Sequence, residues 1–423
     1  MNFDWLDSVG FFTIDLGLDR VYDFLKRLGN PERNLKFLHV AGSNGKGSVC
    51  TFLENGLRGC GYSTGFYSSP HLVSLAERYR LNGTIVDNAS LELAADKVRT
   101  VVETMRLEGK GPTYFEITTA IAIVLFAQKQ VDFVIWETGL GGRLDATNVV
   151  IPELSVITGI SLEHTDYLGS TLAAIAKEKA GIIKDGIPVI CGPLKPEALA
   201  VIRETAAARN APLIEVAPYS ADFHIFRQPD GSPRQELTLE GEQVRLPLPG
   251  VYQRNNAKVA AAALAVLARR YGFGLPAALH ALEHAEWPAR MQFIPSRNLL
   301  IDGAHNPEGA EALSISLREL CPDGKFHFIA GCFADKNAEE VLRFLAPLAL
   351  DFQFIDFDGS GRAVCPPERL SGLLAHYAPD CPSECRSLES AIADLPRPGL
   401  TVLTGSLHMC GEALAILQQT RQL

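Results

Sequence analysis

Several features that mark other classes of protein are missing from this 423-residue sequence. Its nine cysteines include no Cys-x-x-Cys pair, so we predict buried or incidental thiols in a reducing compartment rather than a zinc site or a disulfide framework. No run of about 18 apolar residues occurs, which argues against a membrane-spanning helix. The start of the chain, MNFDWLDSVG, lacks the basic and apolar segments of a signal peptide, and we therefore expect a cytoplasmic protein with no membrane partner.

The sequence is also poor in positive charge. Its 39 lysines and arginines are outnumbered by 49 aspartates and glutamates, and the formal net charge is −10. Nucleic-acid binding needs a basic patch or stripe, so no nucleic-acid partner is predicted. Small anions remain compatible with this charge, because local lysines and helix N-termini can bind them. The length of the chain predicts two domains rather than one.

Apolar runs alternate with helical patterns along most of the chain. In the first half, the predicted strands cover residues 35–42, 131–139 and 153–160, and the predicted helices cover residues 47–61, 113–130 and 170–184. A strand-then-helix rhythm of this kind predicts a mostly parallel sheet that is covered on both faces, which is the α/β class.

The second half of the sequence changes character twice. Residues 219–248 alternate polar and apolar side chains around two turn signals, which indicates a small insertion of β-hairpins, and a long helix is predicted over 255–272. The stretch 286–298 contains two prolines and is the candidate linker between domains. A second α/β series follows it, so we predict domains at 1–288 and 289–423, the second with a smaller, Rossmann-like open sheet.

The stretch HVAGSNGKGSVC (39–50) lies between a predicted buried strand and a helix, where phosphate-binding loops occur. It departs from the general pattern for such loops, because its glycine spacing differs and Gly47 separates Lys46 from Ser48. One interpretation is a nucleotide site, with Lys46 against the β- and γ-phosphates and Ser48 near a magnesium ion. The other is an ordinary strand–helix turn with a surface lysine.

Three further residues follow predicted strands or lie on the next helix. Glu137 ends an apolar strand before a glycine-rich turn, where phosphoryl-transfer enzymes hold magnesium, although a strand can end in glutamate by chance. His164 lies among polar residues and could hold a second cation or orient water. Lys179 lies among small and apolar residues. It either extends to solvent or faces the site with a lowered pKa, in which case it could take up carbon dioxide as a carbamate.

The second predicted domain has a similar junction at IDGAHNPEGA (301–310). Asp302, His305 and Asn306 cluster where a strand gives way to a helix that begins at Pro307. Capping explains Asn306 by itself, but an acid, an imidazole and an amide at the carboxyl edge of a sheet also describe a site. GSLH (405–408) forms a comparable turn after the last predicted strand.

Together these motifs resemble a known family. AGSNGKGSV, YSSPHLVSLAERYRLNG, TYFEITT, ETGLGGRLDATN, LEHTDYLG, EKAGIIK, DGAHNP and TGSLH stand in the order found in bifunctional dihydrofolate synthase/folylpolyglutamate synthases, which are relatives of the Mur ligases. The resemblance runs from TIDLGLDR (13–20) to the last strand. It implies an N-terminal P-loop ATPase domain of the Mur ligase type, a smaller C-terminal domain, and a variant loop that explains the departure at Gly47.

The resemblance also implies an activity. Such enzymes use ATP to convert a carboxylate to an acyl phosphate, which the amine of L-glutamate then attacks. The implied substrates are dihydropteroate and reduced folates, the latter extended at the γ-carboxyl. The implied cofactors are ATP, magnesium (two ions), potassium and a carbamylated Lys179, and the expected state is a monomer.

The family's site residues are carried over by motif. The implied catalytic residues are Lys179, Lys46 and His305. The implied ATP contacts are Ser43, Asn44, Gly45, Lys46, Gly47 and Ser48, with Asn256, Arg290 and Asp302 from across an interdomain cleft. The implied metal ligands are Ser69, Glu137 and His164, whereas the loop by itself pointed to Ser48. The implied pterin contacts are Thr13, Ile14, Thr113, Tyr114, Phe115, Glu116, Leu144, Asp145 and Ala146, and the implied glutamate contacts are His305 and Ser406.

Four positions depart from the family pattern. Ser43 replaces threonine and Glu163 replaces aspartate, and both changes are chemically mild. Tyr252 replaces histidine and His408 stands where tyrosine is common, in the expected adenine and glutamate pockets.

Two alternative functions call for features that this sequence lacks. A cell-wall Mur-type ligase would carry a further N-terminal UDP-binding domain, for which the stretch before the strand at residue 35 leaves no room. The other alternative is a nucleotide-dependent switch or binding module. The guanine-reading Asn-Lys-x-Asp motif is missing, and a predicted cleft between two domains with a C-terminal site favours catalysis.

Overall fold

The computed structural model describes residues 3–7, 9, 15–359 and 361–419, which form two compact units. The first unit contains the segments up to Ser220, Leu239–Glu242 and Asn255–Leu282. The second contains Ala221–Thr238, Gln243–Arg254 and the chain from Glu283 onward. The predicted domain boundary at 288 and 289 stays a prediction.

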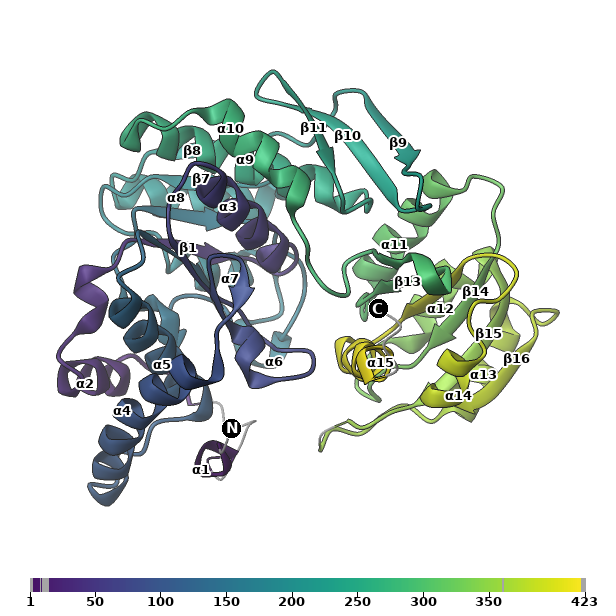
Figure 1. The fold of residues 1–423 in the computed structure, drawn as a ribbon, viewed down its shortest axis with the longest axis horizontal. Coiled ribbons are helices and arrows are strands. Elements are labelled where there is room, and N and C mark those ends of the chain that lie inside the picture. The colour runs from purple at the N-terminus through teal and green to yellow at the C-terminus, as the bar shows by residue number, and fades with distance from the viewer. Residues whose placement is uncertain (1–2, 8, 10–14, 360, 420–423) are drawn as a thin grey trace. The chain divides into compact units, whose positions relative to one another are not determined.

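An eight-stranded sheet forms the centre of the first unit (Figure 1). Its strands, in spatial order, are β4 (Thr84–Ile85), β3 (Tyr79–Leu81), β2 (Thr64–Tyr67), β5 (Phe133–Glu137), β1 (Phe37–Ala41), β6 (Leu154–Ile157), β7 (Val189–Cys191) and β8 (Leu213–Glu215). The six strands from β2 to β8 in this order run parallel, while β3 and β4 pair antiparallel at one edge. The predicted mostly parallel sheet is confirmed.

Central strands β1, β5 and β6 are buried at every residue, as expected for a parallel sheet with both faces covered. The helices of this part of the chain are α1 (Asp4–Asp7), α2 (Asp19–Arg27), α3 (Lys46–Gly59), α4 (Asn88–Leu107), α5 (Tyr114–Lys129), α6 (Thr165–Leu168), α7 (Leu172–Ala180), α8 (Pro196–Ala208), α9 (Tyr252–Tyr271) and α10 (Leu275–His280). Among the described residues, no helix has both the length and the apolar character to cross a membrane.

The predicted hairpin insertion is confirmed as a separate three-stranded sheet. Its strands are β9 (Phe223–Arg227), β10 (Pro233–Leu239) and β11 (Glu242–Leu246), with β10 in the middle. The turns fall at the two predicted turn signals, Asp230-Gly231 and Glu240-Gly241, where the glycines adopt φ angles of 83° and 90°. Glycine suits both positions because a side chain disfavours positive φ.

A six-stranded mixed sheet forms the centre of the second unit. Its strands, in spatial order, are β12 (Gln292–Ile294), β13 (Leu299–Asp302), β17 (Thr401–Thr404), β14 (Phe326–Ala330), β15 (Ala349–Asp356) and β16 (Ser383–Ser387). Its helices are α11 (Pro307–Leu320), α12 (Ala338–Leu345), α13 (Pro367–Tyr377), α14 (Leu388–Ala393) and α15 (Leu407–Gln419). Only β12 runs antiparallel to its neighbour.

The candidate linker 286–298 contains a strand that was not predicted, because β12 lies within it and pairs with β13. Its role as a linker between domains stays a prediction. The two prolines that suggested a linker flank this strand, which is tolerated since an edge strand needs few backbone donors. All nine cysteines are free thiols, as expected.

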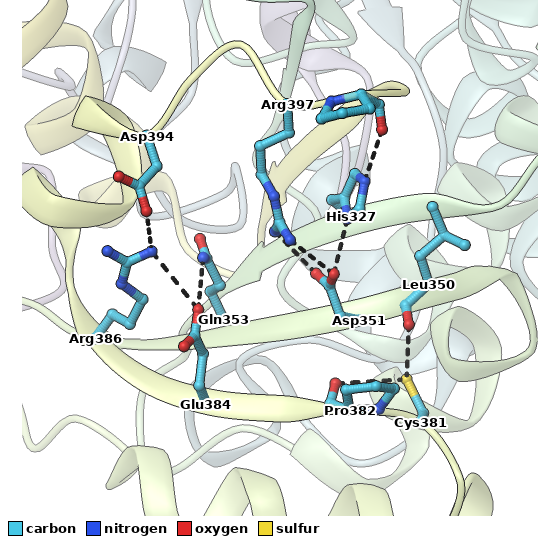
Figure 2. A network of polar contacts seen from close by, with 11 residues as sticks. His327, Leu350, Asp351, Gln353, Cys381, Pro382, Glu384, Arg386, Asp394 and Arg397 are labelled. Atoms are coloured by element: carbon cyan, nitrogen blue, oxygen red, sulfur yellow. Dashed lines mark hydrogen bonds and ion pairs between the residues drawn. The ribbon is translucent and has the colours of Figure 1, made fainter.

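Near the amino ends of its strands, the second unit contains a network of charged side chains (Figure 2). Asp351 of β15 accepts two hydrogen bonds from Arg397, at 3.0 and 2.8 Å, and lies 2.8 Å from Nδ1 of His327. The other ring nitrogen of His327 lies 2.9 Å from the carbonyl oxygen of Pro398. These contacts join β14 and β15 to the segment that enters β17. Beside them, the figure shows a second group made of Gln353, Glu384, Arg386 and Asp394.

Candidate active site

Four neighbouring strands of the first unit end at one edge of the sheet. The residues that lie opposite one another near these ends are Tyr67 and Trp136, Val40 and Glu137, and Ala41 and Ile157. Beyond the strand ends follow Ser69, the loop 42–48 and His164, and Glu137 is the last residue of β5. The structure therefore places the predicted metal ligands at the ends of β2, β5 and β6, and the predicted phosphate loop at the end of β1. All four strand ends lie on the same edge of the sheet.

The loop 42–48 is fixed to the segment that follows β6. The backbone N–H of Ser43 donates to the carbonyl of Gly159 at 2.7 Å. The Ser43 hydroxyl donates to the carbonyl of Ser161 and accepts from its N–H, at 3.1 and 3.0 Å. Thr158 donates to the carbonyl of Asn44 at 2.7 Å. A hydroxyl at position 43 is thus used for anchoring, a role that serine and threonine share.

Two glycines of this loop have no room for a side chain. A Cβ on Gly42 would lie 1.9 Å from Oγ1 of Thr158, and one on Gly45 would lie 2.4 Å from the amide oxygen of Asn256. Gly45 also has a φ of 87° just before α3 begins. Asn256, a predicted ATP contact, therefore lies directly beside the loop.

Lys46 is the first residue of α3, with the buried Ser48 two residues later. Its ammonium donates to the carbonyls of Gly42 and Ser43, at 2.8 and 3.1 Å, so the side chain folds back over its own loop. A lysine at a helix N-terminus adds its charge to the helix dipole and the exposed N–H groups. This arrangement favours the nucleotide interpretation over a simple turn.

Lys179 of α7 is 1% exposed, and its ammonium lies 2.7 Å from the carboxylate of Glu163. Burial and the nearby charge of Lys46 lower the pKa of Lys179 to about 8, although Glu163 acts in the opposite direction. Burial alone would raise the pKa of Glu163, but attraction to the two lysines outweighs it and the pKa is lowered. Of the two interpretations of Lys179, the structure supports the buried one with a lowered pKa.

The predicted metal ligands offer a hydroxyl, a carboxylate and an imidazole. Glu137 is 4% exposed, Ser69 is half-buried and His164 is exposed. Among the residues that the structure describes, no three His, Cys, Asp or Glu side chains gather as a metal site by themselves. The set fits magnesium in its chemistry, because magnesium takes few protein ligands and completes its shell with substrate phosphates and water.

The predicted pterin contacts in 113–116 also organise the start of α5. Thr113 and Glu116 form a reciprocal cap: the Glu116 N–H donates to the Thr113 hydroxyl, and the Glu116 carboxylate accepts from the Thr113 N–H at 2.7 Å. Arg20 donates to both oxygens of Glu116, at 2.8 and 2.9 Å. Tyr114 is buried and Phe115 is half-buried. Thr13 and Ile14 lie outside the described residues.

The predicted contacts Leu144, Asp145 and Ala146 belong to a tightly bonded loop after β5. Asp145 is buried, and its carboxylate accepts from the N–H groups of Leu140 and Thr147, at 2.7 and 3.0 Å, and from the Thr147 hydroxyl at 2.5 Å. Burial raises the pKa of Asp145, while these hydrogen bonds act to lower it. The carboxylate therefore shapes this loop, and its direct contact with a pterin stays a prediction.

In the second unit, Asp302 is buried at the end of β13. Its carboxylate accepts from the hydroxyl of Tyr252 at 2.7 Å and from the N–H groups of Met291 and Ala304, both at 2.9 Å. Burial raises the pKa of Asp302, and the charge of Arg290 acts in the opposite direction. Tyr252, one of the departures from the family pattern, thus provides a hydrogen bond to a predicted ATP residue.

The two predicted glutamate contacts differ in accessibility. His305 is half-buried, with Nδ1 2.9 Å from the carbonyl of Gly303. Ser406 is buried, and its hydroxyl accepts from the N–H groups of His408 and Met409 at the start of α15. His408 packs edge-on against Phe333 at 5.1 Å, and burial lowers the pKa of its ring.

Comparison with known proteins places this geometry in a family. The Mur ligase middle domain matches residues 40–264, and the Mur ligase glutamate ligase domain matches residues 289–404. The dihydrofolate synthase/folylpolyglutamate synthase of Bacillus subtilis is 36% identical over 366 residues, which is 84% of each chain. The chain belongs to the dihydrofolate synthase/folylpolyglutamate synthases of the Mur ligase family.

Two further members of this family match almost the whole chain. The Escherichia coli dihydrofolate synthase/folylpolyglutamate synthase is 34% identical over 425 residues, covering 99% of this chain and 95% of the relative. The structure of E. coli FolC in complex with DHPP and ADP has a TM-score of 0.81 at 32% identity, covering 99% of this chain and 97% of the other. The resemblance inferred from the motifs is therefore confirmed.

Three residues at this site were not predicted to have a role from the sequence. Thr158 and Ser161 hold the phosphate loop, and Arg20 holds Glu116. Polar residues just after an apolar strand were a usable signal for the first two. No local signal existed for Arg20, because its partner lies 96 positions away.

Proposed function

We propose that this protein is an ATP-dependent ligase that joins L-glutamate to dihydropteroate and to the γ-carboxyl of reduced folates. The observation that carries the proposal is the shared sheet edge, where the anchored loop with Lys46 lies near the buried Lys179 and its partner Glu163. Membership of the family supports the same conclusion, since members matching nearly the whole chain carry this activity in their names.

In this proposal the loop Ser43–Ser48 cradles the phosphates of ATP through its N–H groups, and Lys46 neutralises their charge. Asn256 contacts the nucleotide from beside Gly45, and Arg290 and Asp302 contact its phosphate and ribose. The proposed domain boundary lies between residues 288 and 289.

Ser69, Glu137 and His164 are proposed to hold magnesium, and potassium is a further proposed ion. When bound, magnesium neutralises the charge that develops on the transferring phosphoryl group. Lys179 is proposed to act as a carbamate. Its lowered pKa supports this, because only a neutral amine adds carbon dioxide, forming a nitrogen–carbon bond and releasing one proton.

The reaction proceeds in two steps in this proposal. A carboxylate oxygen of the pteroate or folate attacks the γ-phosphorus of ATP, the bond from this phosphorus to ADP breaks, and an acyl phosphate and ADP are formed. The amine of L-glutamate then attacks the carbonyl carbon, the nitrogen loses a proton, and phosphate leaves from the tetrahedral intermediate. Lys46 offsets the charge of the first transition state, and His305 and Ser406 orient the incoming glutamate. The proposed pterin contacts are Thr13, Ile14, Thr113, Tyr114, Phe115, Glu116, Leu144, Asp145 and Ala146.

A product assay tests the proposal. The purified protein is given ATP, magnesium and L-glutamate with either dihydropteroate or a tetrahydrofolate, and products are identified by mass spectrometry. Each acceptor should gain glutamate, with ADP formed only when all substrates are present. Extension of only one acceptor would contradict the bifunctional activity. Turnover only with a UDP-muramyl substrate would favour the Mur-type alternative.

The oligomeric state needs a separate measurement. We propose a monomer, and gel filtration of the purified protein would test this.

A further inference from the structure

We infer that His39, a buried residue of β1, is a positioning residue for the pterin-bearing substrate, which it controls through Thr147 and Asp145. The inference rests on the proposed function, because it assigns the residue to the substrate side of that reaction. His39 is fully buried in the strand that leads to the ATP loop, yet its side chain bonds to the loop after β5. It therefore adds a side-chain contact between these two segments.

Three side chains form a continuous chain of hydrogen bonds. Nε2 of His39 lies 2.9 Å from the hydroxyl oxygen of Thr147, and that hydroxyl lies 2.5 Å from the carboxylate of Asp145. The other oxygen of Asp145 accepts from the N–H of Leu140 at 2.7 Å. The Thr147 hydroxyl therefore connects the ring of His39 to the carboxylate that holds the turn 140–147.

The arrangement of protons along this chain follows from counting donors. Thr147 has one hydroxyl proton, and it goes to Asp145 because a carboxylate can only accept. The hydroxyl oxygen must then accept from His39, so Nε2 carries the ring proton. Nδ1 is a bare acceptor, and although it is buried it has no hydrogen-bond partner among the residues that the structure describes. Burial of such a nitrogen is costly, which argues against a purely space-filling role for the ring.

The ring keeps one protonation state during catalysis. Burial, with a smaller effect from the charge of Lys184, lowers the pKa of His39 to about 3. Lys184 itself donates to the carbonyl of Asn148 at 3.2 Å, and the Asn148 amide donates to the carbonyls of Arg143 and Gly181. The loop is therefore held from β1 on one side and from the end of the Lys179 helix on the other.

Matched pairs of variants test the inference. In His39→Gln the amide nitrogen takes the place of Nε2 and can still donate to Thr147, whereas in His39→Asn it takes the place of Nδ1 and cannot. Thr147→Ser keeps the hydroxyl, and Thr147→Val removes it at equal size. The KM values for dihydropteroate and ATP are measured for each, along with Tm.

We expect His39→Asn and Thr147→Val each to raise KM for dihydropteroate about tenfold, the effect of one buried hydrogen bond. KM for ATP should stay within about twofold, and His39→Gln and Thr147→Ser should restore most of the loss. The double variant His39→Asn/Thr147→Val should also lose about tenfold, because both changes break one chain. An equal rise in KM for ATP, or an additive hundredfold loss, would overturn the inference.

A measurement on the unmutated protein is independent of activity. Nitrogen-15 NMR of labelled histidine should show His39 as the Nε2–H tautomer without titration between pH 5 and 9. A proton on Nδ1 would overturn the inference even if the variants failed to fold. Absence of ligation by the wild-type protein would instead contradict the proposed function, so the two failures can be told apart.

Discussion

The two units each place a cation against a carboxylate, with opposite consequences: Lys179 of the first unit is buried, whereas Arg397 of the second is 23% exposed. In the first unit, Lys179 faces Glu163, and in the second, Arg397 faces Asp351. The two carboxylates are almost equally exposed, at 20% and 21%. Exposure of the acid therefore does not distinguish the two sites.

The difference lies in the cation and in the number of partners. Asp351 receives two parallel bonds from a guanidinium and faces a histidine, so its charge is well compensated. Lys179 has one carboxylate partner and a second cation, Lys46, nearby, and its pKa falls to about 8. Arginine remains charged in proteins, whereas a buried lysine can become a neutral nucleophile. The first pair is suited to chemistry and the second to stability.

The largest predicted effect is on Lys179. We expect Lys179→Ala to lower kcat at least about a thousandfold while the fold is retained, and an added short carboxylate to restore part of the activity. Lys177→Ala, an exposed lysine of the same helix, is the control and should leave kcat unchanged. Unimpaired turnover in Lys179→Ala would rule out the carbamate.

The phosphate loop should tolerate little added volume. In Gly42→Ala the new methyl group meets the Thr158 hydroxyl, so we expect kcat/KM for ATP to fall about 30-fold or more, which corresponds to about 2 kcal/mol. Gly61→Ala provides a control for glycine replacement in open space, although its positive φ should lower Tm slightly. If Gly42→Ala/Thr158→Ala recovers no more activity than Gly42→Ala, the clash is not the cause.

The network of the second unit should affect stability rather than catalysis. Asp351→Ala leaves His327 and Arg397 without their shared acceptor, and we expect the free energy of unfolding to fall by about 2–3 kcal/mol. At temperatures well below the lowered Tm, kcat should match that of the wild-type protein. Asp380→Ala, at an exposed position, is the control in urea unfolding. A large loss of kcat with unchanged Tm would reverse the comparison.

The smallest predicted effect is the pH dependence that Lys179 adds to stability. Its folded pKa, about 8, lies below the unfolded value of about 10.4, so between these values the unfolded chain binds more protons. In buffers freed of carbon dioxide, where Lys179 is an amine rather than a carbamate, the wild-type protein should therefore gain about 1–3 kcal/mol relative to Lys179→Met as pH rises from 8 to 10, with no change below pH 7. Urea unfolding at several pH values measures it, and a constant difference would contradict the lowered pKa.

Much of the fold follows from local patterns in the sequence. Uninterrupted apolar strands such as β1 and β5 can only be buried on both faces, and the turns at Gly231 and Gly241 follow from glycine's freedom at positive φ. The strand β12 inside the candidate linker was missed because proline marks an edge strand as readily as an irregular segment.

The phosphate loop, Glu137 and Lys179 could be found from the sequence because their signal is local: a polar or glycine-rich stretch directly after an apolar strand, or a lysine among small residues. Which partner each side chain meets was decided only by the tertiary structure. Glu163 reaches Lys179 across 16 positions, and His39 reaches Thr147 across 108. Burial at these contacts sets the pKa values of Lys179 and His39, and burial is a property of the packed fold that no short stretch of sequence contains.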